Sequence, residues 1–423
     1  MIVSLSQSSL PFTGIIDSSV LRWQSSPAFF PRLDPAYTAE EQDRRESLVD
    51  RRLDAVDLEL KKTTRSRGDA PRIMARITSL VVEILPYALD VDNAYVNSLL
   101  KRGFSEIGLQ LAQRARRMDA SVSLADILQA ARNAWTACAL QLLLGKEMRL
   151  TRSIFAYSML YPYSDNYLDD VATSPSAKMR FSERFRRRLE GDRLSAADRR
   201  EGIIWDLVGL IESEYPRTAF PQVYDSLLAI HEAQEVSLRQ TQRAPDGGLD
   251  IAALTVTKGG TSVVADACLA AGNLTDEEAS FAFNWGVVLQ LGDDLQDLES
   301  DRQRGSRTLF TEGAAQGTLD RVTNQAFHFG QTVMAEMSEL ETTTPALVEM
   351  LARSSRTLLI RSAASLPQYY RASYLERLES YSPFRFEFLR EREKRFMDRR
   401  RTYAKLFEQV VESDWDGLGG SDW

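Results

Sequence analysis

The chain has 423 residues, 43% of them hydrophobic, and its 60 acidic residues outnumber its 52 basic ones to give a formal charge of −8. This length allows one large helical domain with extensions, or two ordinary domains. Because broad nucleic-acid binding needs a basic surface that replaces phosphate counterions, the acidic balance argues against nucleic acid as a partner.

The N-terminal residues 1–17 lack the charged start and the cleavage site of a secretory signal peptide. No run of about 18 apolar residues is free of charge and proline, so we predict no membrane span and a cytoplasmic protein. Residues 1–38 hold four prolines among serine and aromatic residues, which favours an extended or partly disordered segment. Residues 39–62 predict a charged amphipathic helix, and residues 63–72 predict a linker. Together we interpret residues 1–72 as an N-terminal extension.

From residue 73 to residue 375, apolar side chains recur at spacings near 3.6, which predicts an all-α domain. Cys138 and Cys268 lie within apolar helical patterns, so we expect buried thiols and no disulfide framework. Neither His231 nor His328 completes a Glu-x-x-His pair, which disfavours a di-iron bundle and a zinc site.

No glycine-rich loop follows a predicted strand, so we expect no dinucleotide or P-loop site. Residues 376–423 are interpreted as a C-terminal extension, with one long charged helix over 386–411 and a fraying tail.

The strongest functional signal is an acidic stretch at residues 286–305. On a continuous helix, four of its side chains would share one face at i, i+4, i+7 and i+11, namely Gln290, Asp294, Asp297 and Asp301. Asp293 lies one position away from this face. Like charges at these spacings repel, so the cluster suggests a neutralising cation, and magnesium fits because it prefers oxygen ligands that phosphate can complete.

A second acidic cluster lies at residues 158–172, among aromatic residues. Asp165 and Asp169 form an i, i+4 pair, Asp170 is adjacent, and Tyr161 precedes them on the same face. The alternative for either cluster is an ordinary solvated helix face, since surface helices often carry several acids. Two such clusters inside apolar helices favour the functional interpretation.

In these two motifs the chain resembles the trans-isoprenoid synthases, also called class I terpenoid synthases. Residues 290–297 look like the second aspartate-rich motif of that superfamily, and Asp297 with Asp301 matches the Asp-x-x-x-Asp form of squalene and phytoene synthases. Asp165 to Asp169 is similar to the first motif of that branch. Residues 255–274 resemble the kinked helix that precedes the second motif, and the resemblance covers roughly residues 130–315.

The chain also departs from that pattern. It lacks the Asp-Asp-x-x-Asp first motif that is usual in chain-elongating prenyl synthases, and it lacks the wider squalene-synthase signature. It is more similar to the bacterial large-terpene (class IB) cyclases, which combine this first motif with longer ends.

The resemblance implies an all-α isoprenoid-synthase bundle around a central cavity, with helical extensions at both ends. It implies about two or three magnesium ions bound with a diphosphate. The implied metal ligands are Asp165, Asp169, Asp170, Asp293, Asp294, Asp297 and Asp301. Asp165, Asp169, Asp297 and Asp301 are the implied catalytic residues. The candidate substrate-binding residues are Lys258, Arg239, Arg302, Arg304, Gln290, Tyr161 and Phe283.

These substrate-binding roles have plain alternatives. Arg302 and Arg304 could pair with neighbouring acids, and each aromatic residue could be ordinary core. Lys258 is followed by two glycines, which suggests a local kink.

The predicted function is therefore ionisation of a linear prenyl diphosphate, with release of pyrophosphate and formation of a terpene hydrocarbon or alcohol. Three alternatives stay open: head-to-head prenyl coupling, chain elongation with isopentenyl diphosphate, and a non-catalytic lipid-binding or regulatory relative. The basic run at 180–193 suggests peripheral membrane contact, although a solvated helix face also explains it. A homodimer stays open as well.

Overall fold

The computed structural model describes residues 12–62, 69–92, 94–97, 103–170, 172–237 and 250–413, without the side chains of Phe104, Ser105, Asp169 and Ser413. Over these residues the chain forms 18 α-helices and no strand, which confirms the predicted all-α class. None of the described helices combines the length and the hydropathy that crossing a bilayer requires.

The described residues divide into two compact units whose boundaries follow Phe30, Leu124 and Thr344. Unit 1 holds the residues up to Phe30 and those from Ala125 to Thr344, and unit 2 holds the remainder. These boundaries differ from the predicted segments 1–72, 73–375 and 376–423. The physical reason is that the predicted N-terminal and C-terminal extensions contain helices that pack on each other.

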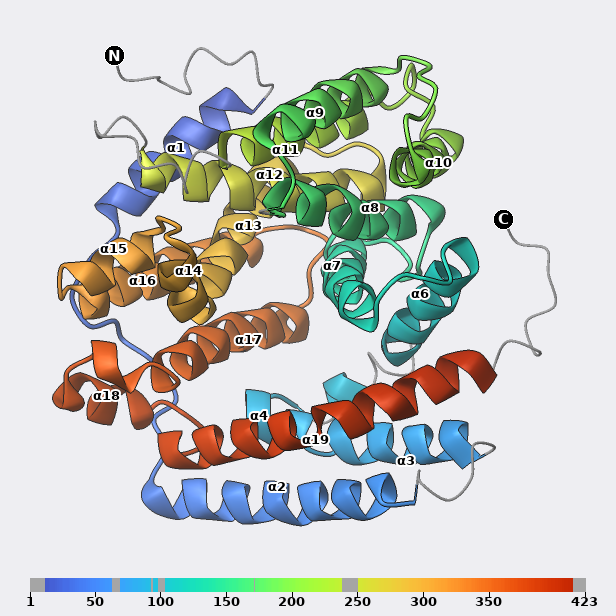
Figure 1. The fold of residues 1–423 in the computed structure, drawn as a ribbon. Coiled ribbons are helices and arrows are strands. Elements are labelled where there is room, and N and C mark those ends of the chain that lie inside the picture. The colour runs from blue at the N-terminus through green and yellow to red at the C-terminus, as the bar shows by residue number, and fades with distance from the viewer. Residues whose placement is uncertain are drawn as a thin grey trace. The chain divides into compact units, whose positions relative to one another are not determined.

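Unit 1 is built around one buried helix. Its helices are α1 (Thr13–Ser25), α7 (Leu124–Leu143), α8 (Arg152–Asp169), α9 (Pro175–Glu190), α10 (Arg199–Glu214), α11 (Pro221–Ser237), α12 (Ile251–Ala271), α13 (Asp276–Gln296), α14 (Leu298–Arg304), α15 (Leu309–Ala315) and α16 (Leu319–Met337). The central helix α12 contacts α1, α8, α11 and α13, and Figure 1 shows it among them. Its sequence is apolar on nearly all sides, which is the pattern of a helix buried all round.

Helix α1 corrects the prediction of an extended segment over residues 1–38. Ile16, Ser19 and Trp23 are buried at helical spacing, and Ser19 Oγ donates to Asn284 Oδ1 at 2.9 Å. The rings of Trp23 and Phe329 also pack in an edge-to-face arrangement, with ring centres 6.2 Å apart. The four prolines of this segment all lie outside Thr13–Ser25, so none of them interrupts the helix.

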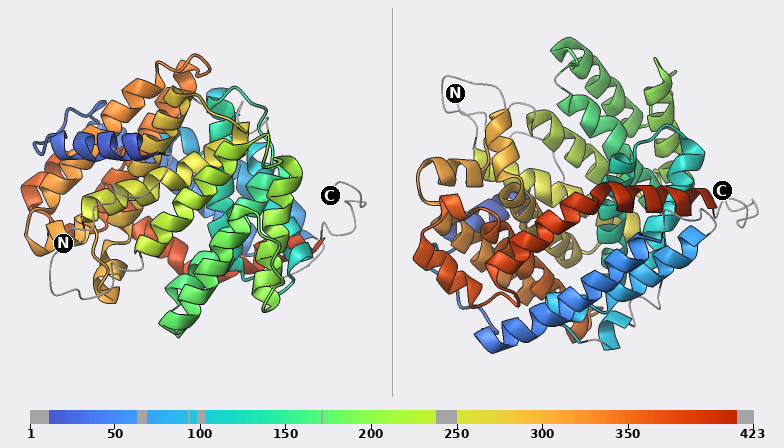
Figure 2. Two further views of the ribbon diagram at one scale, coloured as in Figure 1. Left: turned by 90° about the horizontal axis from the view of Figure 1, so that it is seen from above. Right: turned by 60° about the horizontal axis from the view of Figure 1, so that its bottom comes forward.

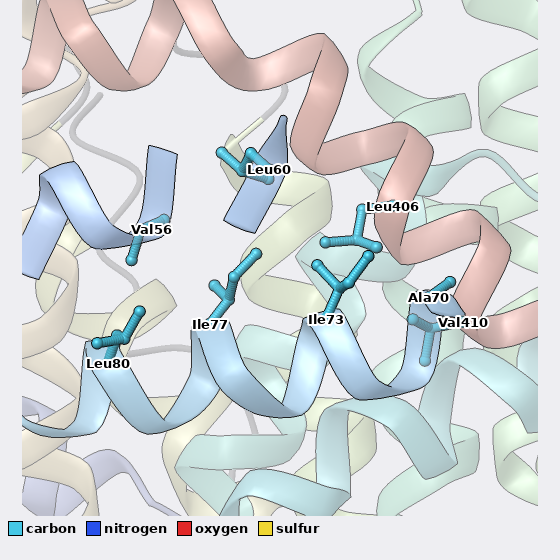
Figure 3. Packing of buried hydrophobic residues seen from close by; sticks show 8 residues of the cluster. All are labelled: Val56, Leu60, Ala70, Ile73, Ile77, Leu80, Leu406 and Val410. Carbon is cyan, nitrogen blue, oxygen red and sulfur yellow. The ribbon is translucent and has the colours of Figure 1, made fainter. Parts of the chain in front are cut away.

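Unit 2 joins helices from both ends of the chain. Its helices are α2 (Ala39–Leu60), α3 (Ala70–Val82), α4 (Leu85–Leu89), α6 (Phe104–Met118), α17 (Pro345–Ala364), α18 (Ala372–Glu379) and α19 (Phe386–Ser413), with a 3-10 turn at Pro367–Tyr369. Figure 3 shows its apolar core, to which α2 contributes Val56 and Leu60, α3 contributes Ile73 and Ile77, and α19 contributes Leu406 with neighbours. Figure 2 shows α19 running beside α2 and α3.

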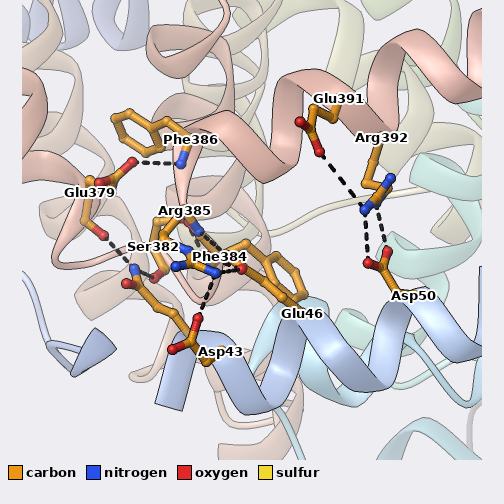
Figure 4. Close-up of polar contacts among 11 residues, drawn as sticks. Asp43, Glu46, Asp50, Glu379, Ser382, Phe384, Arg385, Phe386, Glu391 and Arg392 are labelled. Atoms are coloured by element: carbon orange, nitrogen blue, oxygen red, sulfur yellow. Dashed lines mark hydrogen bonds and ion pairs between the residues drawn. The ribbon is translucent and has the colours of Figure 1, made fainter. Parts of the chain in front are cut away.

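A ladder of ion pairs, which we call the α2–α19 ladder, fixes these two helices in parallel. Starting near their N-termini, Arg385 binds Glu46, Arg392 binds Asp50 at 2.7 Å, Arg395 binds Asp54 at 2.7 Å and Arg399 binds Asp57 at 2.7 Å. Figure 4 shows the first rungs. Residue numbers rise together along both helices, so the helices run in the same direction. The predictions of helices over 39–62 and 386–411 are confirmed.

Candidate active site

Three glycines let the backbones of α12 and α13 come close together. A β-carbon on Gly259 would lie 2.7 Å from the carbonyl oxygen of Gly286, and a β-carbon on Gly286 would lie 2.9 Å from the carbonyl carbon of Gly259. Gly260 makes room for the ring of Phe283 in the same way. α12 runs through Gly259 and Gly260 as one continuous helix, and these glycines serve its contact with α13.

The close contact also explains where Phe283 lies. Its side chain is 0% exposed and its ring fills the space above Gly260. This is a core position in the contact between two helices. The structure thus gives no support to our prediction that Phe283 lines a substrate pocket, and the plain alternative describes it better.

The second aspartate motif spans two helices and not one. α13 ends at Gln296, Asp297 forms the joint with φ −91° and ψ 5°, and α14 begins at Leu298. The backbone still turns in a helical sense, since the Asp301 amide donates to the Asp297 carbonyl at 2.9 Å. The joint therefore keeps the aspartates together although it breaks the predicted continuous helix.

Asp294 is the buried member of this motif, with only 7% of its surface exposed. Gln290 Nε2 donates to Asp294 Oδ1 at 2.7 Å, and Thr255 Oγ1 of α12 lies 3.5 Å from Oδ2. Burial raises the pKa of Asp294 to about 7, against the opposing effects of the Gln290 hydrogen bond and of Lys258. Gln290 therefore orients the Asp294 carboxylate, which agrees with the prediction that the two side chains share one helix face.

The neighbouring carboxylates also resist ionisation. Burial and the repulsion of Asp297 raise the pKa of Asp301 to about 6. Asp293 reaches water, yet enough protein surrounds it that desolvation also raises its pKa. Lys258 of α12 acts on Asp293, Asp294 and Asp301, lowering the pKa of each. The predicted residue Lys258 thus lies beside the acidic cluster, where its charge offsets part of the repulsion.

The two arginines of α14 are exposed to solvent. Arg304 lowers the pKa of Asp301 through its charge, which agrees with the plain interpretation as a partner of that acid. Arg132 of α7, which the sequence analysis missed, acts on Asp293 and lowers its pKa. Arg132 is more than 150 positions from the motif in sequence, so no local spacing rule could have identified it.

The first aspartate motif lies at the C-terminal end of α8. Asp165 is half-buried, accepts a hydrogen bond from Ser164 Oγ at 3.2 Å, and contributes to raising the pKa of Tyr157. Tyr161 is 40% exposed, which leaves its ring accessible. Our predictions for the Asp169 side chain and for Arg239 fall outside the described residues.

Asp170, one of the predicted metal ligands, makes its described hydrogen bonds within the turn after α8. It follows the last residue of α8, and both of its carboxylate oxygens are engaged locally. Oδ1 accepts from the Ala172 amide at 2.9 Å, and Oδ2 accepts from Thr173 Oγ1 at 3.0 Å. These bonds stabilise the turn after the helix and lower the pKa of Asp170, so we assign it a turn-capping role.

Helix α7 connects the two motifs. Asn166, next to Asp165, donates through Nδ2 to Asp126 Oδ1 at 2.9 Å and to Gln129 Oε1 at 3.4 Å. Arg132, which acts on the second motif, lies three residues beyond Gln129. Side chains three apart share a helix face, with β-carbons about 5–6 Å apart. The first motif therefore contacts α7 close to Arg132, whose charge acts on the second motif, and Figure 1 shows α7 beside α8.

A buried carboxyl that the sequence analysis did not single out lies on α12. Asp266 is 1% exposed, and Asn133 Nδ2 of α7 donates to its Oδ1 at 3.0 Å and to Ser158 Oγ of α8 at 3.2 Å. Burial raises the pKa of Asp266 well above its ordinary value. The signal was present as one acid inside the apolar run of residues 262–271. This polar bridge connects α7, α8 and α12 behind the motifs.

Among the described residues, no three histidine, cysteine, aspartate or glutamate side chains gather closely enough to hold a metal ion by themselves. Cys138 and Cys268 are buried free thiols, as predicted, and burial raises the pKa of each to about 12. No protein-family model matches the chain, and no match emerges from a comparison with curated proteins.

Proposed function

We propose that this chain is a magnesium-dependent class I terpene synthase built on an isoprenoid-synthase helical bundle. In this proposal it ionises one linear prenyl diphosphate, releases pyrophosphate and forms a terpene hydrocarbon or alcohol. The observation that carries the proposal is the position of α7, which contacts the first motif through Gln129 and acts on the second through Arg132. Carboxyls of the second motif have pKa values raised by burial and by one another, and such a cluster is typical of a functional site.

The donor set of these motifs fits magnesium. It consists of carboxylate oxygens, and the pKa values of Asp294 and Asp301 are raised by burial first and by neighbouring carboxylates to a lesser extent, a repulsion that a cation would relieve. Magnesium commonly binds through one or two carboxylates, several waters and substrate phosphates, so it does not need a cage of three protein ligands. Asp165, Asp293, Asp297 and Asp301 would hold it, because Asp294 is buried and already accepts a hydrogen bond from Gln290. When bound, magnesium supplies Lewis-acid stabilisation of the departing diphosphate.

The basic residues beside the motifs have a defined part in this chemistry. In ionisation the carbon–oxygen bond of the substrate breaks, and its electron pair stays on the diphosphate oxygen. Lys258 Nζ and the Arg132 guanidinium offer fixed positive charge and hydrogen-bond donors to the oxygens where negative charge grows. Donors held in place by α12 and α7 stabilise this state without reorganising during the reaction.

The hydrocarbon part of the substrate needs different surroundings. The allyl cation must be kept from water until it loses a proton to the released pyrophosphate, or adds one admitted water molecule that then gives up a proton to the pyrophosphate. Tyr161 is an exposed aromatic residue of the first-motif helix, and its π face would stabilise such a cation where bound substrate covers the ring. The chemistry needs no covalent intermediate with a side chain.

The deciding experiment incubates the protein with magnesium and prenyl diphosphates of 10 to 25 carbons. Pyrophosphate release and product mass are measured together. We expect one pyrophosphate per product and a product with the carbon number of its substrate. Twice that carbon number would instead indicate head-to-head coupling, and a gain of five carbons only with isopentenyl diphosphate would indicate elongation. Specific binding without pyrophosphate release from any substrate would favour a non-catalytic lipid-binding protein.

A further inference from the structure

A second site lies in unit 1 at the C-terminal end of α9, away from the residues of the aspartate motifs. A cavity of about 520 Å³ is lined there by Arg188 of α9, Arg193 of the following loop, Trp205 and Glu212 of α10, and Arg217 and Thr218 of the turn before α11. Its size is within the range of small-molecule sites, about 300–1,000 Å³.

Two of these arginines share one carboxylate. Arg188 Nη1 and Nη2 each donate to a separate oxygen of Glu212 at 2.7 Å, and Arg217 donates to Glu212 Oε1 through Nη2 at 2.8 Å and through Nε at 3.1 Å. Arg217 also donates to the carbonyls of Leu189 and Arg188 at the end of α9. One carboxylate thus faces two guanidinium groups, which leaves one positive charge uncompensated in a partly buried place.

Arg193 adds a further positive charge. It lines the same cavity, and neither an ion pair nor a hydrogen bond engages its guanidinium within the part of the chain that the structure describes. Three arginines against one glutamate give the wall a net charge of about +2. Arg193 is exposed to solvent, whereas Arg188, Arg217 and Glu212 are partly buried, and the excess positive charge beside this network is stabilised by an opposite charge in hydrogen-bonding contact.

The remaining polar groups of the wall are also donors. Trp205 is only 9% exposed, and its indole Nε1 is buried without a hydrogen-bond partner among the described residues. Thr218 adds a hydroxyl group that can donate. Apart from Glu212, whose oxygens are occupied by arginine, the lining side chains present donors and apolar surface. Such a wall selects a ligand rich in acceptor oxygens.

We propose that this cavity binds a small phosphate-bearing anion, at a site separate from the aspartate motifs. A phosphate group carries about 1.5 to 2 negative charges at neutral pH, which offsets most of the excess charge of the wall. Its several oxygens also suit guanidinium groups, which bind phosphate through paired N–H donors. The site does not depend on the chemistry proposed for the aspartate motifs, and it would exist in a protein that lacked that activity.

The test is isothermal titration calorimetry of the full chain with inorganic phosphate and with pyrophosphate. Magnesium is left out of the buffer throughout, so the acidic motifs, which repel anions, contribute no binding. The test variant is Arg193→Ala, which removes the unpaired guanidinium and leaves the Arg188–Glu212–Arg217 network in place. The matched control is Arg187→Ala, on the same helix end, whose side chain pairs with Asp192 at 2.8 Å and does not line the cavity.

We expect both anions to bind the wild-type protein, with Kd raised at least about tenfold by Arg193→Ala and less than about twofold by Arg187→Ala. Circular dichroism checks that each variant is folded. Absence of binding to the wild-type protein would overturn the proposal, as would equal losses in the two variants. Citrate serves as a carboxylate probe, and citrate binding as tight as that of pyrophosphate would overturn the assignment to phosphate.

Discussion

Gly259 and Gly286 face each other where α12 meets α13, and neither position has room for a β-carbon. A methyl group on Gly286 would press on the carbonyl group of Gly259, which belongs to the backbone and cannot rotate away. We therefore expect Gly286→Ala to lower the free energy of unfolding by about 1–3 kcal/mol, as overpacking of a core does. Urea denaturation followed by circular dichroism measures this change.

Gly209 of α10 is the matched control, because a β-carbon there would meet no atom within 4 Å. Gly209→Ala should raise the free energy of unfolding by up to about 1 kcal/mol, since alanine is the better helix former. Equal stability of Gly286→Ala and the wild-type protein would contradict the close contact between α12 and α13.

Asp294 should make the metal-free protein less stable as pH rises. Its pKa is raised from 3.8 to about 7, so the folded state binds this proton more tightly than the unfolded state does. The resulting stabilisation is complete below about pH 4 and is lost as pH rises to about 7, an effect on the order of 4 kcal/mol. Asp294→Asn removes it while keeping an acceptor for Gln290.

The measurement is the free energy of unfolding in EDTA between pH 4 and pH 8, for the wild-type protein and for Asp294→Asn. We expect the variant to gain stability relative to the wild-type protein across this range. Two curves that run parallel would show that Asp294 titrates in the folded state as it does in the unfolded chain.

Metal removal should abolish the proposed activity. EDTA should stop pyrophosphate release, and excess magnesium should restore it. Asp165→Asn and Asp297→Asn should each lower kcat by about 10²–10³-fold, since each removes a carboxylate that would hold the metal. Asp206→Asn changes an exposed aspartate of α10 far from the motifs in sequence, and it should retain full activity. Full activity of both motif variants would refute the site.

Binding of magnesium with pyrophosphate should release protons near pH 6.5. Asp301, with a pKa of about 6, and Asp294, with a pKa of about 7, are partly protonated there, and a cation beside them favours their ionised forms. Calorimetry in two buffers with different heats of ionisation counts the protons. Release should be smaller at pH 8.5, and an equal count at both pH values would argue against these two carboxyls as the source.

The α2–α19 ladder should contribute most through Glu46, which is 5% exposed and accepts bonds from the backbone and side chain of Arg385. Glu46→Gln should lower the free energy of unfolding by about 1–3 kcal/mol, because it removes a buried carboxylate charge and leaves the Arg385 guanidinium without that ion-pair partner. Arg72→Ala disrupts the exposed Arg72–Asp69 pair, where the atoms are 3.9 Å apart, and should change stability by less than about 0.5 kcal/mol. Similar effects of the two substitutions would contradict the expectation that the buried ion pair contributes more to stability than the exposed one.

Features that depend on local pattern could be predicted from the sequence. Helices α2 and α19 were predicted because charged and apolar residues alternate along them at helical spacing. Helix α1 was missed because the prolines that flank it dominated the composition of residues 1–38. The division into two units was missed because apolar spacing shows that a segment is helical without showing which distant segment it packs against.

The residues of the candidate site also fall into those that local spacing predicts and those that depend on tertiary packing. Asp294, Gln290 and Asp301 could be placed together because they follow one another at helical spacing. Arg132 and Asp266 could not, because each reaches its partners through tertiary packing between helices distant in sequence. The joint at Asp297 was also missed, since a helical repeat can continue across a change of backbone angle.

The α2–α19 ladder has a consequence for how the chain is made on the ribosome. Asp50 and Arg392 are 342 positions apart, and nearly all of unit 1 is encoded between them. When α2 leaves the exit tunnel, its arginine partners have not been translated. Its acidic face therefore has no ion-pair partner on α19, and its apolar side chains have no packing partner there, until α19 emerges. Every residue of unit 1 emerges before α19 does. Unit 1 can therefore fold during synthesis, whereas unit 2 is completed only after α19 has emerged.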